Sequence, residues 1–488
     1  MPVNFIPSGD DLLRFAPETI LTVAGTLLMV LDPFFARRMP KLFGNISIVA
    51  LVAAMVGAIQ ANSVPGPAFS NLLIVDGFAT YFRVLVLAIG ILAVLSSYRY
   101  LDREKAETGE YHALLLFSIV GQCVMVAAND LIMIFIGLEI SSIATYILAG
   151  YLRDDKRNNE AALKYFLLGS FATAFLLYGI AMIYGVSGTT KLDEIRAALN
   201  NPAGLPSVAM VGIAAALMFV GLAFKVSAAP FQIWAPDVYQ GAPAPVSAFM
   251  ATGPKAAAFA IFLRIFLTAF QQVAGGWEPL IWISALLSMT IGNFAALTQT
   301  NLKRMLAYSS IAHAGYVLVA LAARSEIGTA AAMFYLAAYA LMNIGAFAVV
   351  IQIAGKHEGH LRIDDLAGLG RAQPVTAAML TIFLLSFIGV PLTGGFFGKF
   401  YIFRAALESN LIWLTVLGLL NSAVAAYYYL RLLVVMYFKE PGEVAGNLEP
   451  LTPGLRAALI LPAIGTFVLG VLPGTILDFA QRSASFVR

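Results

Sequence analysis

Residues 225–246, KVSAAPFQIWAPDVYQGAPAPV, place a helix break beside a lysine inside a long apolar segment. Lys225 ends an apolar run that begins near residue 207, and Pro230 follows shortly after it. A proline inside a helix removes a backbone hydrogen bond and clashes with the preceding turn. We therefore expect one apolar helix over residues 207–236 that is interrupted directly after Lys225.

The composition excludes a water-soluble fold. Of the 488 residues, 60% are hydrophobic and 12% are charged, whereas soluble domains carry roughly 25% charged residues. Apolar runs such as residues 82–95, 131–150 and 333–353 suit a hydrocarbon core, which takes about 20 apolar residues per helix. The chain is therefore expected to be an all-α integral protein of the lipid bilayer. Its net charge of +3 gives no footprint for nucleic acid.

Cysteine and histidine are too scarce for most redox centres. Cys123 is the only cysteine, which excludes an intrachain disulfide, a thiolate zinc site and a self-contained iron–sulfur cluster. The chain has 4 histidines and no Gly-rich nucleotide loop after a strand pattern, so it lacks the usual means to hold haem or NAD. We expect no cofactor in this chain, so that any redox chemistry belongs to a partner.

Apolar runs separated by polar or Pro/Gly breaks predict about fourteen membrane helices. They are expected over residues 17–36, 45–61, 76–98, 112–128, 130–151, 161–186, 207–236, 244–270, 277–299, 302–323, 326–354, 373–405, 411–438 and 455–476. The longest polar interruptions, residues 187–206 and 355–373, are too short to build a soluble core. The prediction is one polytopic membrane domain over residues 1–488, with no signal-peptide pattern at its start.

Basic residues predict the orientation, because cytoplasmic loops retain Lys and Arg. With the N-terminus outside, sixteen of them fall in inside loops and six outside. The inside set is Arg37, Arg38, Lys41, Arg99, Arg103, Lys105, Arg153, Lys156, Arg157, Lys303, Arg304, Lys356, Arg362, Arg371, Lys439 and Arg456, and the outside set is Arg14, Lys191, Arg196, Arg324, Arg482 and Arg488. An even number of helices then places both termini outside.

A second break matches the first. The twelfth expected helix is interrupted by Gly389, Pro391 and further glycines just before Lys399. Matched breaks in two halves of a membrane protein indicate repeats around an ion path. The breaks are five helices apart, and an odd offset inverts the second unit, so residues 112–270 and 277–438 are expected to form an inverted pair of five-helix repeats. The alternative is that Pro and Gly are simply commoner in membrane helices.

Three ionisable residues are expected near the middle of the membrane. Glu139 lies about nine residues into its helix, which is roughly 14 Å deep at 1.5 Å per residue. Lys255 and His313 lie at similar depths in theirs. A charge at this depth costs at least about 2.5 to 3.5 kcal/mol, so we expect these side chains to face the bundle interior. They predict a buried polar axis.

The axis suits proton movement, because burial favours the neutral form of a lysine and a nearby carboxylate favours the charged form. Glu139 facing Lys225 would hold that lysine charged, and withdrawing the carboxylate would release a proton toward the remaining carriers. These are Lys255, His313 and Lys399. Two alternatives stay open: a static Glu139–Lys225 ion pair, and a His313 that only packs helices through Ser309 or Ser310.

Other charges fit simpler roles. We interpret four arginines near helix ends as anchors that reach the headgroups, namely Arg83, Arg264, Arg404 and Arg431. Lys164, one turn into its helix, either feeds Lys225 or is an ordinary surface charge. The pair His357 and His360 resembles a metal spacing weakly, and a solvated loop explains it better.

Several segments resemble the antiporter-like membrane subunits of proton-pumping NADH:quinone oxidoreductase, respiratory complex I. They are residues 225–246, GLEISSIATYIL around Glu139, ALKYFLLG around Lys164, KRMLAYSSIAHAG around His313 and GVPLTGGFFGKFYIF around Lys399. The resemblance covers about residues 75–435. It implies fourteen helices with two inverted units, and it implies working residues at Glu139, Lys225, Lys255 and Lys399.

The resemblance also implies a function, partners and a location. It implies a subunit of a proton-translocating oxidoreductase in the bacterial inner membrane, with both termini periplasmic. FMN, iron–sulfur clusters and quinone are expected in partner subunits, which include neighbouring antiporter-like and small membrane subunits. A cation/proton antiporter subunit shares the broken helices and lysines, but the PDVYQGAPAPV segment favours complex I. A third alternative is a protein that only anchors other subunits in the membrane. Such a protein would need no ionisable residues aligned at the same depth, so this alternative is the least favoured.

Overall fold

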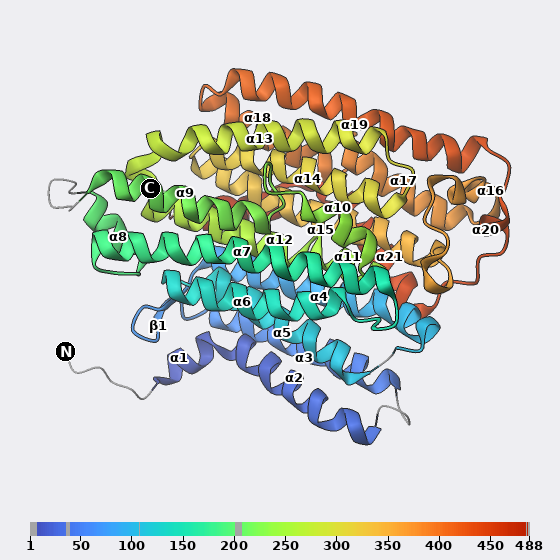
Figure 1. Cartoon of the computed structure of the whole chain (residues 1–488), viewed down its shortest axis with the longest axis horizontal. Helices are drawn as coiled ribbons and strands as arrows, with labels where there is room; N and C mark the ends of the chain where they lie inside the picture. Colours follow the sequence, from blue (N-terminus) through green and yellow to red (C-terminus); the bar gives the residue numbers. More distant parts are fainter. Residues whose placement is uncertain (1–6, 36–39, 107, 201–206, 485, 487–488) are drawn as a thin grey trace.

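The computed structural model describes residues 7–35, 40–106, 108–200, 207–484 and 486 as a bundle of nearly parallel helices (Figure 1). Within this part, twelve helical segments are long and apolar enough to cross a membrane. They include α2 (Ala16–Phe35), α3 (Pro40–Ala61), α4 (Gly77–Glu104), α5 (Gly109–Ala127), α6 (Leu131–Ala149), α7 (Lys156–Ser187), α13 (Ala274–Leu297), α14 (Leu302–Ala322), α15 (Glu326–Ile353), α19 (Ile412–Phe438) and α21 (Pro453–Val471).

The two expected breaks are present. In the segment predicted over residues 207–236, α9 (Val208–Lys225) ends at Lys225 itself, and the next helix, α10 (Trp234–Gly241), begins only at Trp234 and continues past the predicted end. The segment predicted over residues 373–405 consists of α17 (Pro374–Ile388) and α18 (Gly394–Glu408). At the second break Gly389 closes α17 with φ +91°, a backbone conformation that favours glycine.

A third break was not expected. The segment predicted over residues 244–270 divides into α11 (Ala244–Met250) and α12 (Gly253–Arg264), followed by a π-helical turn, η2 (Ile265–Ala269). Pro254 stands in the first turn of α12, where its missing N–H costs no helical hydrogen bond. The proline therefore begins a new helix shortly after α11 ends, and Lys255 follows it directly.

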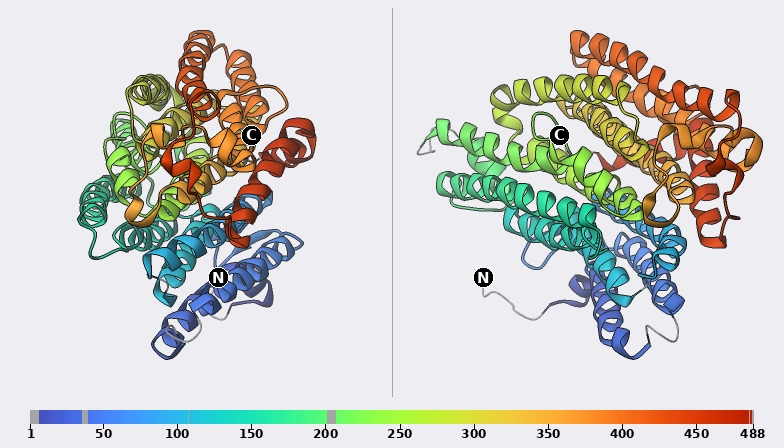
Figure 2. Two further views of the ribbon diagram at one scale, coloured as in Figure 1. Left: turned by 90° about the vertical axis from the view of Figure 1, so that its right-hand side faces the viewer. Right: turned by 45° about the vertical axis from the view of Figure 1, so that its right-hand side comes forward.

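The order of the helices follows the chain across the bundle (Figures 1 and 2). α2 and α3 lie at one edge and α18 and α19 at the other, while α21 returns to pack on α4 and α15. α12, α14 and α15 are buried along almost their whole length and form the centre. α2, α7 and α19 each keep an exposed apolar face, which suits contact with lipid.

Short elements cap the two ends of the bundle. The hairpin of β1 (Gly66–Ala68) and β2 (Leu73–Val75) lies with α8 (Leu192–Leu199) at one end, and α16 (Leu369–Ala372) lies with α20 (Glu443–Gly446) at the opposite end (Figure 1). The remaining short elements are α1 (Gly9–Arg14), η3 (Gln271–Val273), η4 (Lys356–Glu358), η5 (Ile363–Leu366) and α22 (Gly474–Ser483). The expected outside and inside loops are thus at opposite ends. Arg37, Arg38 and Arg488 lie outside the described residues.

Two of the predicted arginine anchors have a different role. The Arg83 side chain is fully buried and pairs with Glu18 of α2 at 2.6 Å. The Arg264 side chain, 5% exposed, pairs with Asp76 at the start of α4 at 2.9 Å. The prediction that these arginines reach the headgroups is therefore wrong. Their carboxylate partners lie on helices distant in the sequence, so spacing along one helix could not reveal them.

Candidate functional site

Lys225 is held by hydroxyl groups at the end of α9. Its Nζ donates to Ser142 Oγ at 2.6 Å and to the Tyr165 hydroxyl at 3.4 Å. It also lies 5.4 Å from the ring centre of Tyr146 and 5.3 Å from that of Tyr165. A cation at a helix C-terminus is favoured by the helix dipole, and the two rings add cation–π attraction. The site therefore accommodates a charged ammonium without a carboxylate in contact.

Glu139 lies on α6 at the edge of its buried face, next to the exposed side chains of Ile136, Ile140 and Ile143. Its Oε1 atom is buried and has no hydrogen-bond partner among the described residues. Within that same part of the chain no ion pair joins it to Lys225. Ser142, one turn further along α6, binds the Lys225 ammonium, a contact that was expected from the Glu139 carboxylate. The acid can therefore influence Lys225 only through space.

Lys255 meets α14 directly after the third break. Its Nζ donates to Ser310 Oγ at 2.5 Å and to the Ser310 carbonyl at 3.1 Å. The side chain is 2% exposed, which is consistent with the predicted burial. Lys255 thus lies in the first turn of α12, which begins at Gly253, and its side chain contacts the neighbouring helix α14.

His313 lies between two tyrosines. Its Nδ1 is 2.5 Å from the Tyr335 hydroxyl of α15 and its Nε2 is 3.1 Å from the Tyr429 hydroxyl of α19. Ser309 also hydrogen-bonds Tyr429. The expected packing partners Ser309 and Ser310 therefore do not bind the imidazole themselves. Both ring nitrogens have a partner that can donate or accept, which is the arrangement a proton shuttle needs.

Lys399 is held by the helix break beside it. Its Nζ donates to the carbonyls of Phe387 and Ile388 at 2.9 and 3.0 Å and to Ser422 Oγ at 2.8 Å. The two carbonyls belong to the last turn of α17, where no further helical N–H is available to them. The ammonium also lies 4.8 Å from the ring centre of Tyr316. A largely apolar hollow of about 590 Å³ opens between α18 and α19 beside this lysine.

Lys164 points away from Lys225. Its Nζ pairs with Asp237 of α10 at 2.8 Å and with Glu160 at 2.7 Å, and Arg304 pairs with the same aspartate at 2.6 Å. These groups line a polar hollow of about 250 Å³. The next residue, Tyr165, contacts Lys225 instead, because successive residues on a helix point about 100° apart. The structure does not bring Lys164 to the buried axis.

One stripe of α14 contacts both Lys255 and Lys399 and contains His313 between the two contacts. Ser310 binds Lys255, His313 lies three residues on, and Tyr316 lies over Lys399 after three more. Residues three apart share one face of a helix. Tyr239 lies near Ser310 of this stripe and near Ser227 at the first break, and its hydroxyl donates to the Met250 carbonyl at 3.4 Å.

The sequence did not reveal which hydroxyl groups bind the buried lysines and His313. They are Ser142, Tyr165, Ser310, Tyr335, Ser422 and Tyr429. A search for buried hydroxyls within the expected spans would have found them as candidates, but not their partners. Among the described residues no group of three or more His, Cys, Asp or Glu side chains could hold a metal ion. His357 instead pairs with Glu104 at 3.2 Å.

Residues 128–425 match the family described as NADH:quinone oxidoreductase/Mrp antiporter, TM. Among curated proteins, NADH-quinone oxidoreductase subunit N 1 of Solibacter usitatus is 68% identical over 485 residues, which cover 99% of both chains.

Two solved structures extend the comparison. A chain of respiratory complex I from Thermus thermophilus with bound aureothin is 35% identical, with a TM-score of 0.80 over 96% of this chain and 99% of that one. A chain of the Mrp complex from Dietzia is 20% identical, with a TM-score of 0.82 over 98% of this chain and 97% of the other. The Mrp likeness concerns the fold alone.

Proposed function

Because this chain belongs to the membrane family of NADH:quinone oxidoreductase and Mrp antiporter subunits, we propose that it acts as the subunit N type of complex I. In this role it translocates protons as NADH is oxidised and quinone reduced. The observation that carries the proposal is the α14 stripe, which joins Lys255, His313 and Lys399 on one buried helix face. The 68% identity to a subunit N supports it over the full chain.

The redox chemistry belongs to partner subunits in this proposal. FMN, the iron–sulfur clusters and the quinone are placed there, and this chain contributes the buried carriers. Neighbouring antiporter-like and small membrane subunits cover part of its exposed apolar faces. The chain is a multi-pass membrane protein, and we place it in the bacterial inner membrane with both termini periplasmic.

Proton transfer would begin at Lys225. Its ammonium is held by Ser142 and Tyr165, and the Glu139 carboxylate adds a long-range attraction. When that carboxylate is withdrawn or neutralised, the charged lysine is less favoured and its proton can leave. Tyr239, which lies near Ser227 and Ser310, is the group we place between Lys225 and Lys255.

The second half would receive the proton through α14. The Ser310 hydroxyl would accept a proton from Lys255 only as it releases its own proton toward His313, three residues further along α14. The His313 imidazole would take up that proton on one ring nitrogen and release one from the other nitrogen to a tyrosine hydroxyl, Tyr335 or Tyr429. Lys399 is the exit carrier, since it adjoins the break between α17 and α18. We assign the two inverted repeats to residues 112–270 and 277–438, supported by the matched breaks beside Lys225 and Lys399.

An antiporter that works outside complex I is the weaker alternative. The likeness to the Mrp complex has 20% identity, whereas the likeness to a subunit N has 68%. Copurification separates the two. Recovery of this chain within an assembly that contains flavin and iron–sulfur clusters is expected, and cation/proton exchange by the isolated chain would contradict the proposal.

The decisive functional test is proton pumping per NADH oxidised in the assembled complex. Glu139→Ala and Lys225→Ala should both lower this ratio at comparable assembly levels, because one removes the long-range attraction and the other removes the carrier. Unchanged pumping in both variants would leave only a static role for the two residues.

A further inference from the structure

The loop after α15 contains a buried carboxylate between exposed neighbours. Glu358 is 8% exposed, whereas the side chain of His357 next to it is 73% exposed. The loop is anchored to the first half of the chain on two sides. Arg157 at the start of α7 donates to the His357 carbonyl at 2.8 Å, and Glu104 at the end of α4 accepts from the His357 amide at 2.9 Å. Glu358 therefore points inward from a loop that is fixed.

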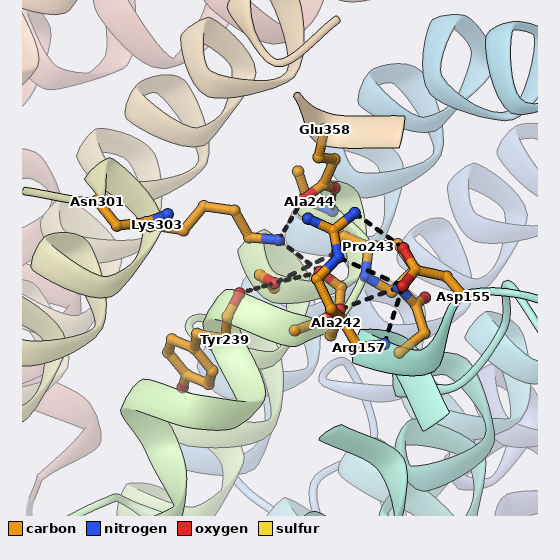
Figure 3. A network of polar contacts seen from close by, with 12 residues as sticks. Asp155, Arg157, Tyr239, Ala242, Pro243, Ala244, Asn301, Lys303 and Glu358 are labelled. Carbon is orange, nitrogen blue, oxygen red and sulfur yellow. Dashed lines mark hydrogen bonds and ion pairs between the residues drawn. The ribbon is translucent and has the colours of Figure 1, made fainter. Parts of the chain in front are cut away.

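Glu358 binds the start of α11 (Figure 3). Its Oε1 accepts a 2.7 Å hydrogen bond from the amide of Ala244, the first residue of that helix. The preceding residue, Pro243, offers no side-chain cap. A carboxylate at the start of a helix is favoured both by the free amides and by the helix dipole. The cap thus comes from a loop 114 residues away in the sequence.

Lys303 closes the same turn from the other side. Its side chain is fully buried, and its Nζ pairs with Glu358 Oε2 at 2.7 Å and donates to the Ala242 carbonyl at 2.5 Å (Figure 3). Lys303 is the second residue of α14. The turn between α10 and α11, from Ala242 to Ala244, is therefore enclosed by one carboxylate and one ammonium that also bind each other.

The turn tied to Lys303 leads along the chain to Lys255, which contacts α14 again. α11 leads through the third break into α12, which carries Lys255, and α14 leads from Lys303 to Ser310 on the same face seven residues on. The Lys255–Ser310 hydrogen bonds join the two helices further along. Arg304, the next residue of α14, binds Asp237 and Gln240 of α10, and the pair of Glu358 and Lys303 adds a tie at the α10–α11 turn itself.

We propose that Glu358 is a positioning residue for proton transfer: with Lys303 it fixes the α10–α11 turn to α14 and thereby sets the approach of Lys255 to Ser310. This inference rests on the proposed relay. Glu358 acts through the turn and touches none of the carriers assigned above. Loss of either partner leaves the other charge buried and unpaired, whereas loss of both charges removes that penalty.

The test compares Glu358→Ala, Glu358→Gln, Lys303→Met and the double variant Glu358→Gln/Lys303→Met in the assembled complex. Assembly level, NADH oxidation and protons pumped per NADH are measured for each. We expect the pumping ratio to fall in Glu358→Ala and Lys303→Met. The double variant should assemble better than Lys303→Met and still pump less than the wild type, because neutrality is restored but the tie is not.

A contact readout accompanies pumping. Amide exchange of the segment 238–250 should be faster in Glu358→Ala than in Glu358→Gln, whose amide oxygen can still accept from Ala244. Glu440→Gln is the matched control, because Glu440 forms an exposed ion pair with Arg371 at 2.8 Å in the same half of the chain. The control should exchange and pump like the wild type.

Four outcomes would overturn the inference, and they separate the role of Glu358 from the relay itself. If the double variant assembles and pumps at the wild-type ratio, the pair is only structural, and it is equally only structural if assembly alone falls in all four variants. Lys255→Met is run in parallel. Normal pumping by Lys255→Met removes the relay and the positioning role with it, whereas impaired Lys255→Met beside normal Glu358 variants removes only the role of Glu358.

Discussion

Lys225 donates a 2.6 Å hydrogen bond to Ser142, which lies one turn beyond Glu139 on α6. A serine hydroxyl, rather than the carboxylate, is therefore the immediate partner of this buried ammonium. The carboxylate can change its charge or position without breaking the hydrogen bond that holds the lysine. This separates the group that holds the proton carrier from the group that is expected to control it.

The hydrogen bond between Lys225 and Ser142 predicts that removal of the Ser142 hydroxyl lowers proton pumping. Ser142→Ala should weaken the hold on the Lys225 ammonium, since a hydrogen bond to a charged group contributes about 1.5 to 3 kcal/mol. We expect proton pumping per NADH to fall by roughly tenfold at unchanged assembly, which is about 1.4 kcal/mol. Ser170→Ala, on the exposed face of α7, is the control, and equal pumping in the two variants would contradict the role of Ser142.

Substitutions of Lys399 can distinguish a residue that carries a proton from one that only supplies a positive charge. Lys399→Arg keeps a positive charge but stays protonated at any working pH, while Lys399→Met removes the charge. A relay lysine must lose its proton, so both variants should pump poorly at comparable assembly levels. Normal pumping by Lys399→Arg would show that the carbonyls of Phe387 and Ile388 need only a fixed cation.

The topology predicts opposite labelling of two loops. Lys156→Cys, at the start of α7, should react with an impermeant maleimide from the cytoplasmic side, and Lys191→Cys, before α8, from the outside. Cys123 is buried and does not compete. Labelling of both cysteines from the same side would remove the inverted repeat, since α7 alone separates them.

The buried pair of Glu18 and Arg83 predicts a stability effect outside the relay. Arg83→Met leaves the Glu18 carboxylate buried and unpaired, which costs about 3 to 5 kcal/mol. We expect lower assembly and a lower melting temperature of the complex. Glu18→Gln/Arg83→Met, which removes both charges, should recover much of the loss. A single variant as stable as the wild type would show that water reaches the carboxylate.

The helix breaks beside Lys225 and Lys399 could be predicted from the sequence, because each depends on residues that are neighbours along the chain. The break after Lys225 follows from Pro230, and the break before Lys399 follows from the glycines around Pro391, because these residues act locally. The break between α11 and α12 carries the same kind of local signal in Pro254. It escapes prediction because the apolar run continues on both sides of this proline, so hydropathy alone joins the two helices into one.

Contacts between distant segments are the part that the sequence could not supply. The direction of Lys164 depends on where α10 places Asp237, and the burial of Arg83 depends on Glu18 of another helix. In the sequence, Lys164 and Arg83 are both basic residues within an apolar helix. In the structure, Lys164 lines a polar hollow, whereas Arg83 is enclosed by protein. Depth within a helix is readable from spacing, but the direction of a side chain needs the packing.

The contacts made by Ser310, His313 and Tyr316 all depend on the position of one helix, α14. Ser310, His313 and Tyr316 follow one another at steps of three residues along a buried part of this helix. Lys255 binds Ser310, and Lys399 lies over the ring of Tyr316. A single displacement of α14 would therefore alter the surroundings of both lysines at once, although Lys255 belongs to α12 and Lys399 to α18.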